Sequence, residues 1–239
     1  IYIILGYLNK LVFIIPKITE SFIQTGTEIP ALTQFIIDLS NFLRNEYIKI
    51  LISLFIFISF IIFFKKTYIG EYFFGLISIK MPIFGYIIKK SNTIYFINSF
   101  SLLMESGVLL LDSLKTSSTV VGNIHYKKEI IRIKNEVESG LTMSKSLGLN
   151  LEYETNIYLN KLFSEDFAYI VNTGEETGTL SESLKKIGSN YNGELKRYIS
   201  NISTLIEPFM IVFVGFLVGT IVIAIMLPFF KIGEIAKQL

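Results

Sequence analysis

The longest uninterrupted apolar stretch of this 239-residue chain lies near its end, at residues 206–230. From Pro208 to Pro228 it carries no charged side chain. As a helix, about 21 residues at 1.5 Å each would extend about 31 Å, which is the hydrocarbon thickness of a bilayer. A soluble helix is seldom apolar on every face over that length. We therefore predict a transmembrane helix over 206–230 and a short extracytoplasmic tail over 231–239.

A second apolar stretch covers residues 48–64, and Lys65 and Lys66 follow it directly. About 17 residues is the lower limit for a span, so we predict a second transmembrane helix there. Residues 1–15 are also apolar, but the stretch is short and polar residues interrupt it. It is read as the end of a first transmembrane helix, with an interfacial amphipathic segment as the alternative. The chain begins without Met, and we expect upstream sequence to be missing.

Residues 16–47 are predicted to form two helices outside the membrane. The second begins at Pro30, which suits the first turn of a helix, and apolar residues recur at helical spacing behind it. We assign these residues to an extracytoplasmic helical loop.

The central region, residues 65–205, is predicted to be a bundle of six helices without strands, because apolar positions recur at spacings of three and four and never alternate. The apolar positions of the six helices begin at Ile94, Leu111, Ile130, Met143, Phe163 and Leu180. Glycines are expected to end three of them, at Gly107, Gly122 and Gly174. Residues 72–88, interrupted by Gly75, Pro82 and Gly85, either lie against the membrane or lead into the bundle.

The last of these helices is the most informative. Its apolar positions run without a break from Leu180 to Phe209 and enter the final span. We predict one helix of about 50 residues, kinked at Pro208, that joins the bundle to the bilayer.

The composition agrees with a multi-pass membrane protein of all-α class that has two full spans and one partial span. The hydrophobic fraction is 51% and the mean hydropathy is +0.54. A net charge of +2 argues against nucleic acid as a partner. Lys and Arg near the spans are more frequent on the central side, so the positive-inside rule places 65–205 in the cytoplasm and both flanks outside.

The chain has few of the residues that form catalytic or metal-binding sites. The chain has no Cys and one His, His125, and contains neither a phosphate-binding loop nor an H-E-x-x-H motif. Glu207 is the only acid within a predicted span, at its edge, where it is either a functional group or a boundary residue beside a helix-initiating proline. We expect no catalytic residue, no metal and no cofactor.

Three groups of residues are candidates for interaction. The acidic turn with Gly174, Glu175, Glu176 and Gly178 is either a helix end followed by a helix start or a contact for a basic partner. The basic residues Lys127, Lys128 and Arg132 are either a solvated helix face or a surface for a partner or lipid headgroups. Gly215 and Gly219 form G-x-x-x-G, which either packs helices closely or reflects the frequency of glycine in membrane helices.

Several motifs, in order, resemble those of the type II secretion F / type IV pilus PilC family of inner-membrane platform proteins. They are Ile15-Pro16, the segment from Glu28 to Ser40, Phe100 to Val108, Gly140-Leu141, Gly174 to Leu180, Glu207-Pro208 and Pro228. Each motif is weak, but together they cover nearly the whole chain.

The resemblance implies a multi-pass protein of the bacterial cytoplasmic membrane with two homologous cytoplasmic bundles, of which only the second is present. It implies a non-enzymatic platform on which a hexameric cytoplasmic ATPase drives pilins or pseudopilins into a filament, together with other inner-membrane platform subunits, membrane lipid and further copies of itself. Carried over to this sequence, the turn around Glu175 is a candidate for coupling, and Glu207 with Pro208 for a membrane hinge.

Two other classes remain open. A permease subunit of an ATP-driven transporter would need polar residues at the middle of its spans, which these spans lack. A membrane-anchored receptor would need an external ligand cavity, and residues 16–47 are few for that purpose.

Overall fold

The computed structural model describes residues 31, 34–35, 38, 41–42, 45–150, 157–158 and 160–235. The predicted partial span at 1–15, most of the expected loop at 16–47 and the last four residues of the tail, 236–239, lie outside these residues. The chain divides into two compact units, Ile62–Thr204 and the pair Ile1–Ile61 with Leu205–Leu239. We refer to Ile62–Thr204 as the bundle.

Both predicted full spans are helices that are long and apolar enough to cross a membrane. α3 covers Tyr47–Lys65 with a mean hydropathy of 2.6, within one residue of the predicted limits. α10 covers Leu180–Ile235 as one helix of 56 residues, and its apolar part has a mean hydropathy of 2.0. The prediction of a single long helix through Pro208 is therefore confirmed. The side of the membrane on which each segment lies stays a prediction.

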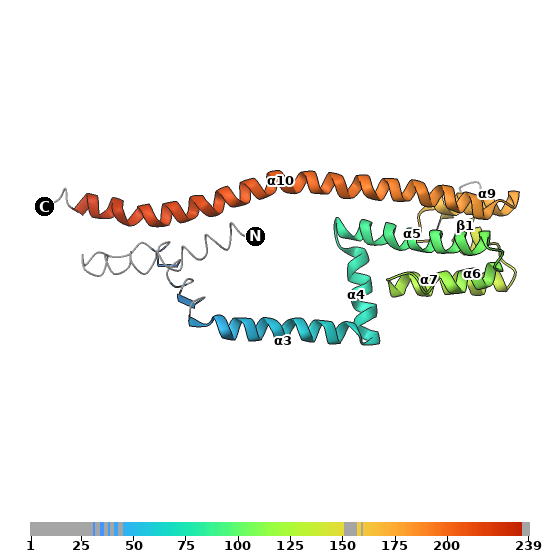
Figure 1. Ribbon diagram of the computed structural model, residues 1–239, viewed down its shortest axis with the longest axis horizontal. Helices are drawn as coiled ribbons and strands as arrows, with labels where there is room; N and C mark the ends of the chain where they lie inside the picture. Colours follow the sequence, from blue (N-terminus) through green and yellow to red (C-terminus); the bar gives the residue numbers. More distant parts are fainter. Residues whose placement is uncertain are drawn as a thin grey trace. The chain divides into compact units, whose positions relative to one another are not determined.

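The bundle is built from the expected six helices and one additional helix at its start (Figure 1). The helices are α4 (Tyr68–Lys80), α5 (Phe84–Glu105), α6 (Leu110–Ser117), α7 (Ile124–Glu138), α8 (Met143–Ser146), α9 (Glu165–Thr177) and the first part of α10. α5 lies between α10 and the pair α6–α7, and α4 crosses the end of α5 (Figure 1). The two axes of α4 and α5 meet at a bend of 110°.

An aromatic cluster lies at the centre of the bundle core. Phe96 and Phe100 of α5 stack with ring centroids 5.4 Å apart, and Phe163 lies 5.6 Å from Phe96. Tyr126 of α7 contacts Phe163 edge to face at 5.3 Å. Most of the predicted core positions are buried, which confirms the helical periodicity: Ile94, Ile97 and Phe100 in α5, Ile130 and Ile133 in α7, and Leu180, Leu184, Ile187 and Tyr191 in α10. Met104, Val137 and Leu195 are partly buried, and Leu205 and Phe209, the last positions of the run in α10, are exposed. Leu141 is an exception because α7 has already ended and Gly140, at φ +100°, turns the chain outward.

The structure corrects three helix boundaries and adds a small sheet. α6 ends at Ser117, before the expected Gly122, and α9 continues through Gly174 to Thr177. Of the three expected interruptions in 72–88, the break falls only at Pro82; Gly75 lies within α4 and Gly85 within α5. Two strands were not predicted, β1 (Leu149–Asn150) and β2 (Ile157–Tyr158), which pair antiparallel. Strands of two residues are too short to show alternation.

Candidate functional site

The turn between α9 and α10 is shaped by two glycines with different roles. Gly178 ends α9 with φ +67°, a left-handed conformation that favours glycine. Gly174 is buried one turn earlier, where a Cβ atom would lie 2.9 Å from the Cα atom of Leu180. The amide of Thr179 donates to the Gly174 carbonyl at 2.9 Å and closes the turn. The expectation that Gly174 ends the helix is therefore wrong; it allows α10 to begin close against α9.

The two glutamates of this turn have different surroundings. The carboxylate of Glu175 accepts hydrogen bonds from the backbone amides of Met143, at 2.6 Å, and Ser144, at 2.9 Å. These amides begin α8, so Glu175 satisfies donors that a short helix would otherwise leave unpaired. Glu176 is exposed and accepts a hydrogen bond from Asn172 at 2.8 Å. Glu175 thus connects α9 to α8, while Glu176 faces outward.

The basic residues of α7 do not form one surface. Lys127 is exposed. Lys128 donates to the hydroxyl of Tyr68 on α4 at 2.7 Å, and this hydrogen bond raises the pKa of Lys128. Its ammonium also lies 4.9 Å from the ring centroid of Tyr72. Arg132, one turn further along α7, is bound by a different set of residues.

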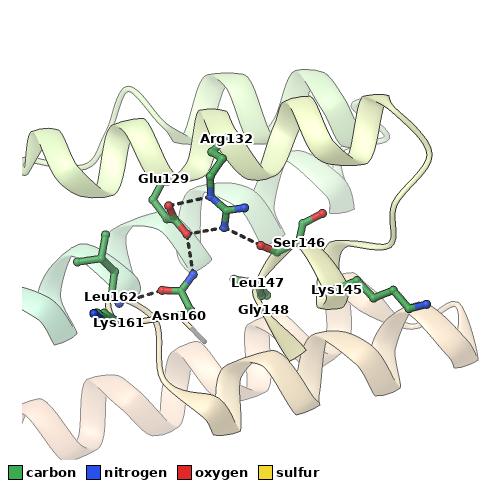
Figure 2. A pocket seen from close by; sticks show the side chains of 9 residues that line it. All are labelled: Glu129, Arg132, Lys145, Ser146, Leu147, Gly148, Asn160, Lys161 and Leu162. Carbon is green, nitrogen blue, oxygen red and sulfur yellow. Dashed lines mark hydrogen bonds and ion pairs between the residues drawn. The ribbon is translucent and has the colours of Figure 1, made fainter. Parts of the chain in front are cut away.

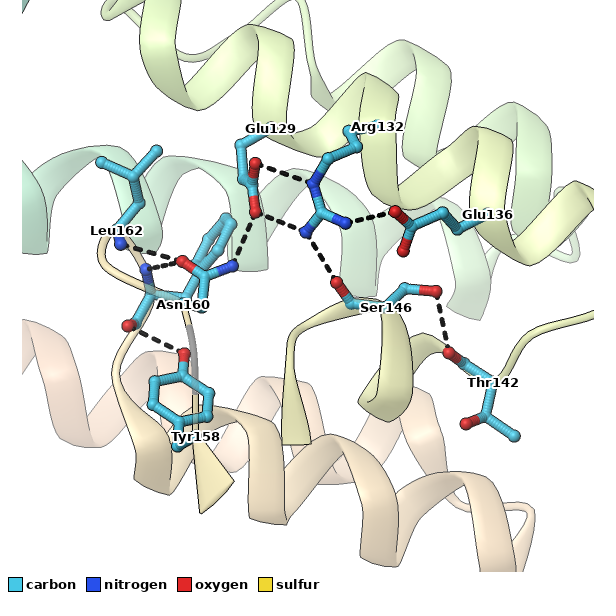
Figure 3. A network of polar contacts seen from close by, with 9 residues as sticks. Glu129, Arg132, Glu136, Thr142, Ser146, Tyr158, Asn160 and Leu162 are labelled. Carbon is cyan, nitrogen blue, oxygen red and sulfur yellow. Dashed lines mark hydrogen bonds and ion pairs between the residues drawn. The ribbon is translucent and has the colours of Figure 1, made fainter. Parts of the chain in front are cut away.

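Arg132 lies at the centre of a polar network that connects α7, α8 and the segment after β2 (Figure 3). Its Nη2 atom donates to Glu129 at 2.6 Å and to the carbonyl of Ser146 at 2.7 Å, and its Nη1 atom pairs with Glu136. Asn160 donates to the same Glu129 carboxylate at 2.6 Å. The hydrogen bond to Glu129, ahead of that to Glu136, raises the pKa of Arg132. Arg132 therefore holds the short α8 in place.

A pocket of about 410 Å³ opens beside this network (Figure 2). Glu129, Arg132 and Asn160 form its polar wall, and Lys145 and Lys161 add two positive charges. Arg132 pairs with Glu129 within this lining. Among the described residues, no cluster of three or more His, Asp or Glu side chains could hold a metal ion.

A second polar network, which the sequence did not suggest, connects α5, α9 and α10. The hydroxyl of Tyr191 donates to Asp166 at 2.6 Å and lies 2.7 Å from the hydroxyl of Ser164. Lys90 of α5 lies 3.2 Å from the Tyr191 ring centroid and 2.8 Å from Glu194. Burial acts to raise the pKa of Asp166, but the hydrogen bonds from Ser164 and Tyr191 outweigh it and lower that pKa. Burial, followed by the bond to Asp166, raises the pKa of Tyr191.

The residues predicted for membrane packing lie in the apolar part of α10. Glu207 and Pro208 are inside the continuous helix, and Glu207 is exposed. A Cβ atom at Gly215 or Gly219 would meet no described atom within 4 Å. The helix continues beyond Pro228 to Ile235, so this proline does not end it.

Comparison with known proteins shows similarity along most of the chain. Residues 96–228 match the family "Type II secretion system (T2SS), protein F". The type IV pilus assembly protein PilC of Pseudomonas aeruginosa is 30% identical over 94% of this chain and 58% of its own length. The protein transport protein HofC homolog of Haemophilus influenzae is 31% identical over 96% of this chain and 57% of its own length. The type II secretion system protein F of P. aeruginosa is 25% identical over 97% of this chain and 54% of its own length.

The chain thus spans between half and three-fifths of the length of these relatives. The family match begins inside α5 and ends inside α10, so it covers most of the bundle and the apolar part of α10. The two candidate spans and the family together indicate an inner-membrane protein. The motifs from Phe100 to Val108 and from Gly174 to Leu180 fall inside the matched residues, and the chain belongs to the type II secretion system protein F family.

Proposed function

We propose that this chain is part of a non-enzymatic assembly platform in the bacterial inner membrane, in a type IV pilus or type II secretion machine. The family membership supports this proposal, as do the names of the relatives, which refer to type IV pilus assembly and to type II secretion. Because the chain lacks a phosphate-binding loop, the energy for assembly has to come from a partner, for which a hexameric cytoplasmic ATPase is the candidate.

The observation that carries the mechanism is the continuity of α10 from the bundle core to the end of its apolar part, over 56 residues. An α-helix transmits displacement along its axis because every turn is hydrogen-bonded to the next. In the proposed mechanism, the ATPase displaces the cytoplasmic bundle, and α10 carries the displacement to a pilin or pseudopilin in the membrane.

The bundle end of α10 is held firmly enough for such a role. A Cβ atom at Gly188 would lie 2.9 Å from Asn98 Oδ1 and 3.0 Å from Ile97 Cγ2, so the two helices pack closely there. The hydroxyl of Ser181 donates to the carbonyl of Ser101 at 3.2 Å. Lys185 pairs with Glu105 at 2.9 Å. A movement of α5 would therefore take α10 with it.

The contacts divide the candidate residues between direct and indirect roles. Glu176, Lys127 and the pocket beside Arg132 are accessible and are proposed to meet other subunits. Glu175 is proposed to act indirectly, because its carboxylate is already engaged by α8. The open faces of Gly215 and Gly219 are proposed to pack against a pilin helix or a second copy of this chain, with Glu207 and Pro208 as the hinge.

The first test is a purification of the full-length protein from its native host in mild detergent, with the co-purifying proteins identified. We expect a hexameric secretion ATPase and small pilin-like proteins. A nucleotide-binding transport subunit together with a solute-binding protein would contradict the platform and support a permease subunit.

The second test addresses α10 itself. Ser203, Thr204 and Leu205 are exposed at the boundary between the two units. Replacing all three by Gly weakens the helix by about 1 kcal/mol per residue relative to replacement by Ala. We expect the Ala variant to assemble filaments and the Gly variant to insert into the membrane and bind the ATPase without assembling them. Equal numbers of filaments from both variants would refute transmission through α10.

A further inference from the structure

The outward face of α4 is apolar although it belongs to the bundle. Its exposed side chains include Ile69, at 68%, and Phe73, at 55%, with Leu76 on the same side at helical spacing. Tyr72 lies at the edge of this face, with its ring centroid 4.4 Å from that of His125 on α7. The surface continues through the α4–α5 corner, where Met81, Ile83 and Phe84 are exposed. A contiguous apolar surface of this kind is uncommon on a soluble monomer and indicates an interaction site.

The opposite side of α4 is packed against the bundle, which fixes the orientation of the apolar face. The side chain of Asn123 donates to the carbonyl of Gly75 at 2.9 Å, and a Cβ atom at Gly75 would lie 3.2 Å from both Ile124 and His125. Ile79 is buried in the core. The apolar face of α4 therefore points away from the bundle.

The chain connection places α4 next to the end of a candidate span. α3 ends at Lys65 and α4 begins at Tyr68. The connection is tight, because a Cβ atom at Gly70 would collide with the carbonyl oxygen of Phe64. The rings of Phe64 and Phe74 also contact edge to face at 6.3 Å. α4 therefore begins directly after the candidate span α3 and turns away from it.

Within the bundle, α4 runs across one end of α5 (Figure 1). The two helices meet at a bend of 110°. α5 in turn packs along the first part of α10, with the ring centroids of Tyr86 and Tyr198 4.4 Å apart. α5 does not extend a span that began in α4, because Ile94, Phe96, Ile97 and Phe100 are buried in the bundle core.

The charges and aromatic groups around this face fit lipid headgroups. Lys65 and Lys66 are exposed before α4 and Lys80 at its last residue. Tyr68 and Tyr72 are exposed beside the apolar residues. Lysines that flank an apolar face, with tyrosines at its rim, are typical of helices that lie in the interface of an anionic leaflet.

We propose that α4 is an interfacial helix that lies on the anionic surface of the bilayer, with Ile69, Phe73 and Leu76 inserted among the acyl chains. The lysines at its ends contact the phosphate groups. This rests on the inner-membrane location in the proposed function but not on the platform role. The bundle is then attached to the bilayer by a flat helix as well as by the two spans.

The chain contains no Trp, so a single introduced Trp is a specific fluorescent probe. The full chain would be reconstituted in nanodiscs of phosphatidylcholine and phosphatidylglycerol whose acyl chains are brominated near the headgroup. F73W and I69W report on α4. L109W is the matched control, because Leu109 is 74% exposed but lies beyond the far end of α5. F57W, in the middle of α3, reports on the span.

We expect F73W and I69W to emit at shorter wavelength than L109W and to be quenched about two-fold or more by the brominated lipid, because interfacial helices bury their apolar face at acyl-chain depth. L109W should be unaffected.

Quenching of F57W without quenching of F73W and I69W would refute the interfacial helix and leave the membrane location intact. Emission at short wavelength without quenching would mean that protein covers α4, and would also refute it. Quenching of L109W as strong as that of F73W would refute the proposal, because the contact with lipid would then not be specific to α4. Absence of quenching in all four variants would refute the membrane location itself.

Discussion

The two parts of α10 differ in the distribution of their apolar residues, although they form one helix. In the bundle, apolar residues follow one face, where Leu184, Ile187 and Tyr191 are buried, and the opposite face carries the exposed Lys186. In the part from Leu205 onward, large apolar side chains are exposed on all sides, among them Phe209, Ile211, Val212 and Phe216. The first part is stabilised by protein contacts, and the second requires an apolar solvent. The sequence pattern therefore changes where the surroundings of the helix change.

The sharpest test of this difference compares two leucines of α10. Leu184 is fully buried, whereas Leu205 is 72% exposed. Leu184→Ala should destabilise the bundle by about 2–5 kcal/mol, because it removes buried apolar contacts and leaves a cavity. Leu205→Ala should change the stability by less than about 0.5 kcal/mol. Chemical denaturation of the detergent-solubilised protein, followed by circular dichroism, measures both, and equal losses would contradict the division of α10.

Three glycines of α10 provide a second contrast. Gly188→Ala should destabilise the bundle by about 1–3 kcal/mol, since the new methyl group would be forced against Asn98 and Ile97. Gly193→Ala should stabilise it by up to about 1 kcal/mol through helix propensity, because its nearest neighbour would be Arg197 Nη1 at 3.9 Å. Gly215→Ala should leave the bundle unchanged. Thermal melting followed by circular dichroism ranks the three, and any other order would argue against close packing at Gly188.

The start of α10 offers a third contrast, between neighbouring glutamates. Glu175→Gln should weaken the attachment of α8 by about 1–2 kcal/mol, because an amide accepts hydrogen bonds more weakly than a carboxylate and can accept through one atom only. The amides of Met143 and Ser144 should then exchange hydrogen faster. Glu176→Gln, on the exposed side, is the control and should have no effect. Unchanged exchange in Glu175→Gln would mean that the carboxylate does not hold α8.

The smallest expected effect is a pH dependence at Asp166. Its pKa is lowered in the folded protein from an ordinary value of 3.8. The unfolded chain therefore binds more protons in acid, and the contribution of Asp166, complete above about pH 4, is lost as the pH falls through the folded pKa. Melting temperatures of the wild type should decrease on acidification, and Asp166→Asn should decrease less steeply. Parallel decreases in both would exclude a contribution from Asp166.

The sequence was sufficient for features that repeat along the chain. The limits of α3 were predicted to within one residue, since an apolar run that ends at two lysines has few other interpretations. The sequence was insufficient where a boundary depends on a neighbour. In the sequence, Gly174 resembles a residue that ends a helix. In the structure a glycine is needed there because the backbone of Leu180 packs against it and leaves no room for a side chain.

Contacts between distant residues were also beyond prediction. Asp166 and Tyr191 are 25 positions apart in the sequence, and only the fold brings the carboxylate of one to 2.6 Å from the hydroxyl of the other. Glu175 was assigned to coupling from the family motif. Its hydrogen bonds to α8 depend on the packing of α8 against α9, because Met143 and Ser144 are 32 and 31 positions away in the sequence. The three basic residues of α7 looked like one patch because sequence spacing says little about which element each side chain meets.

The corner between α4 and α5 combines a strained backbone with an exposed apolar side chain. Ile83 has φ +66° and ψ −60°, and the amide of Phe84 donates to the carbonyl of Pro82 at 2.7 Å, so the corner is a γ-turn of the rare, strained kind that costs about 1–3 kcal/mol. Yet its side chain is 55% exposed, on the surface that continues from α4. Transfer of this exposed half into an apolar phase would yield about 1–1.5 kcal/mol, or half of the value for a whole isoleucine side chain. In the proposed docking on lipid, this burial would offset much of a strain that the corner carries uncompensated in water.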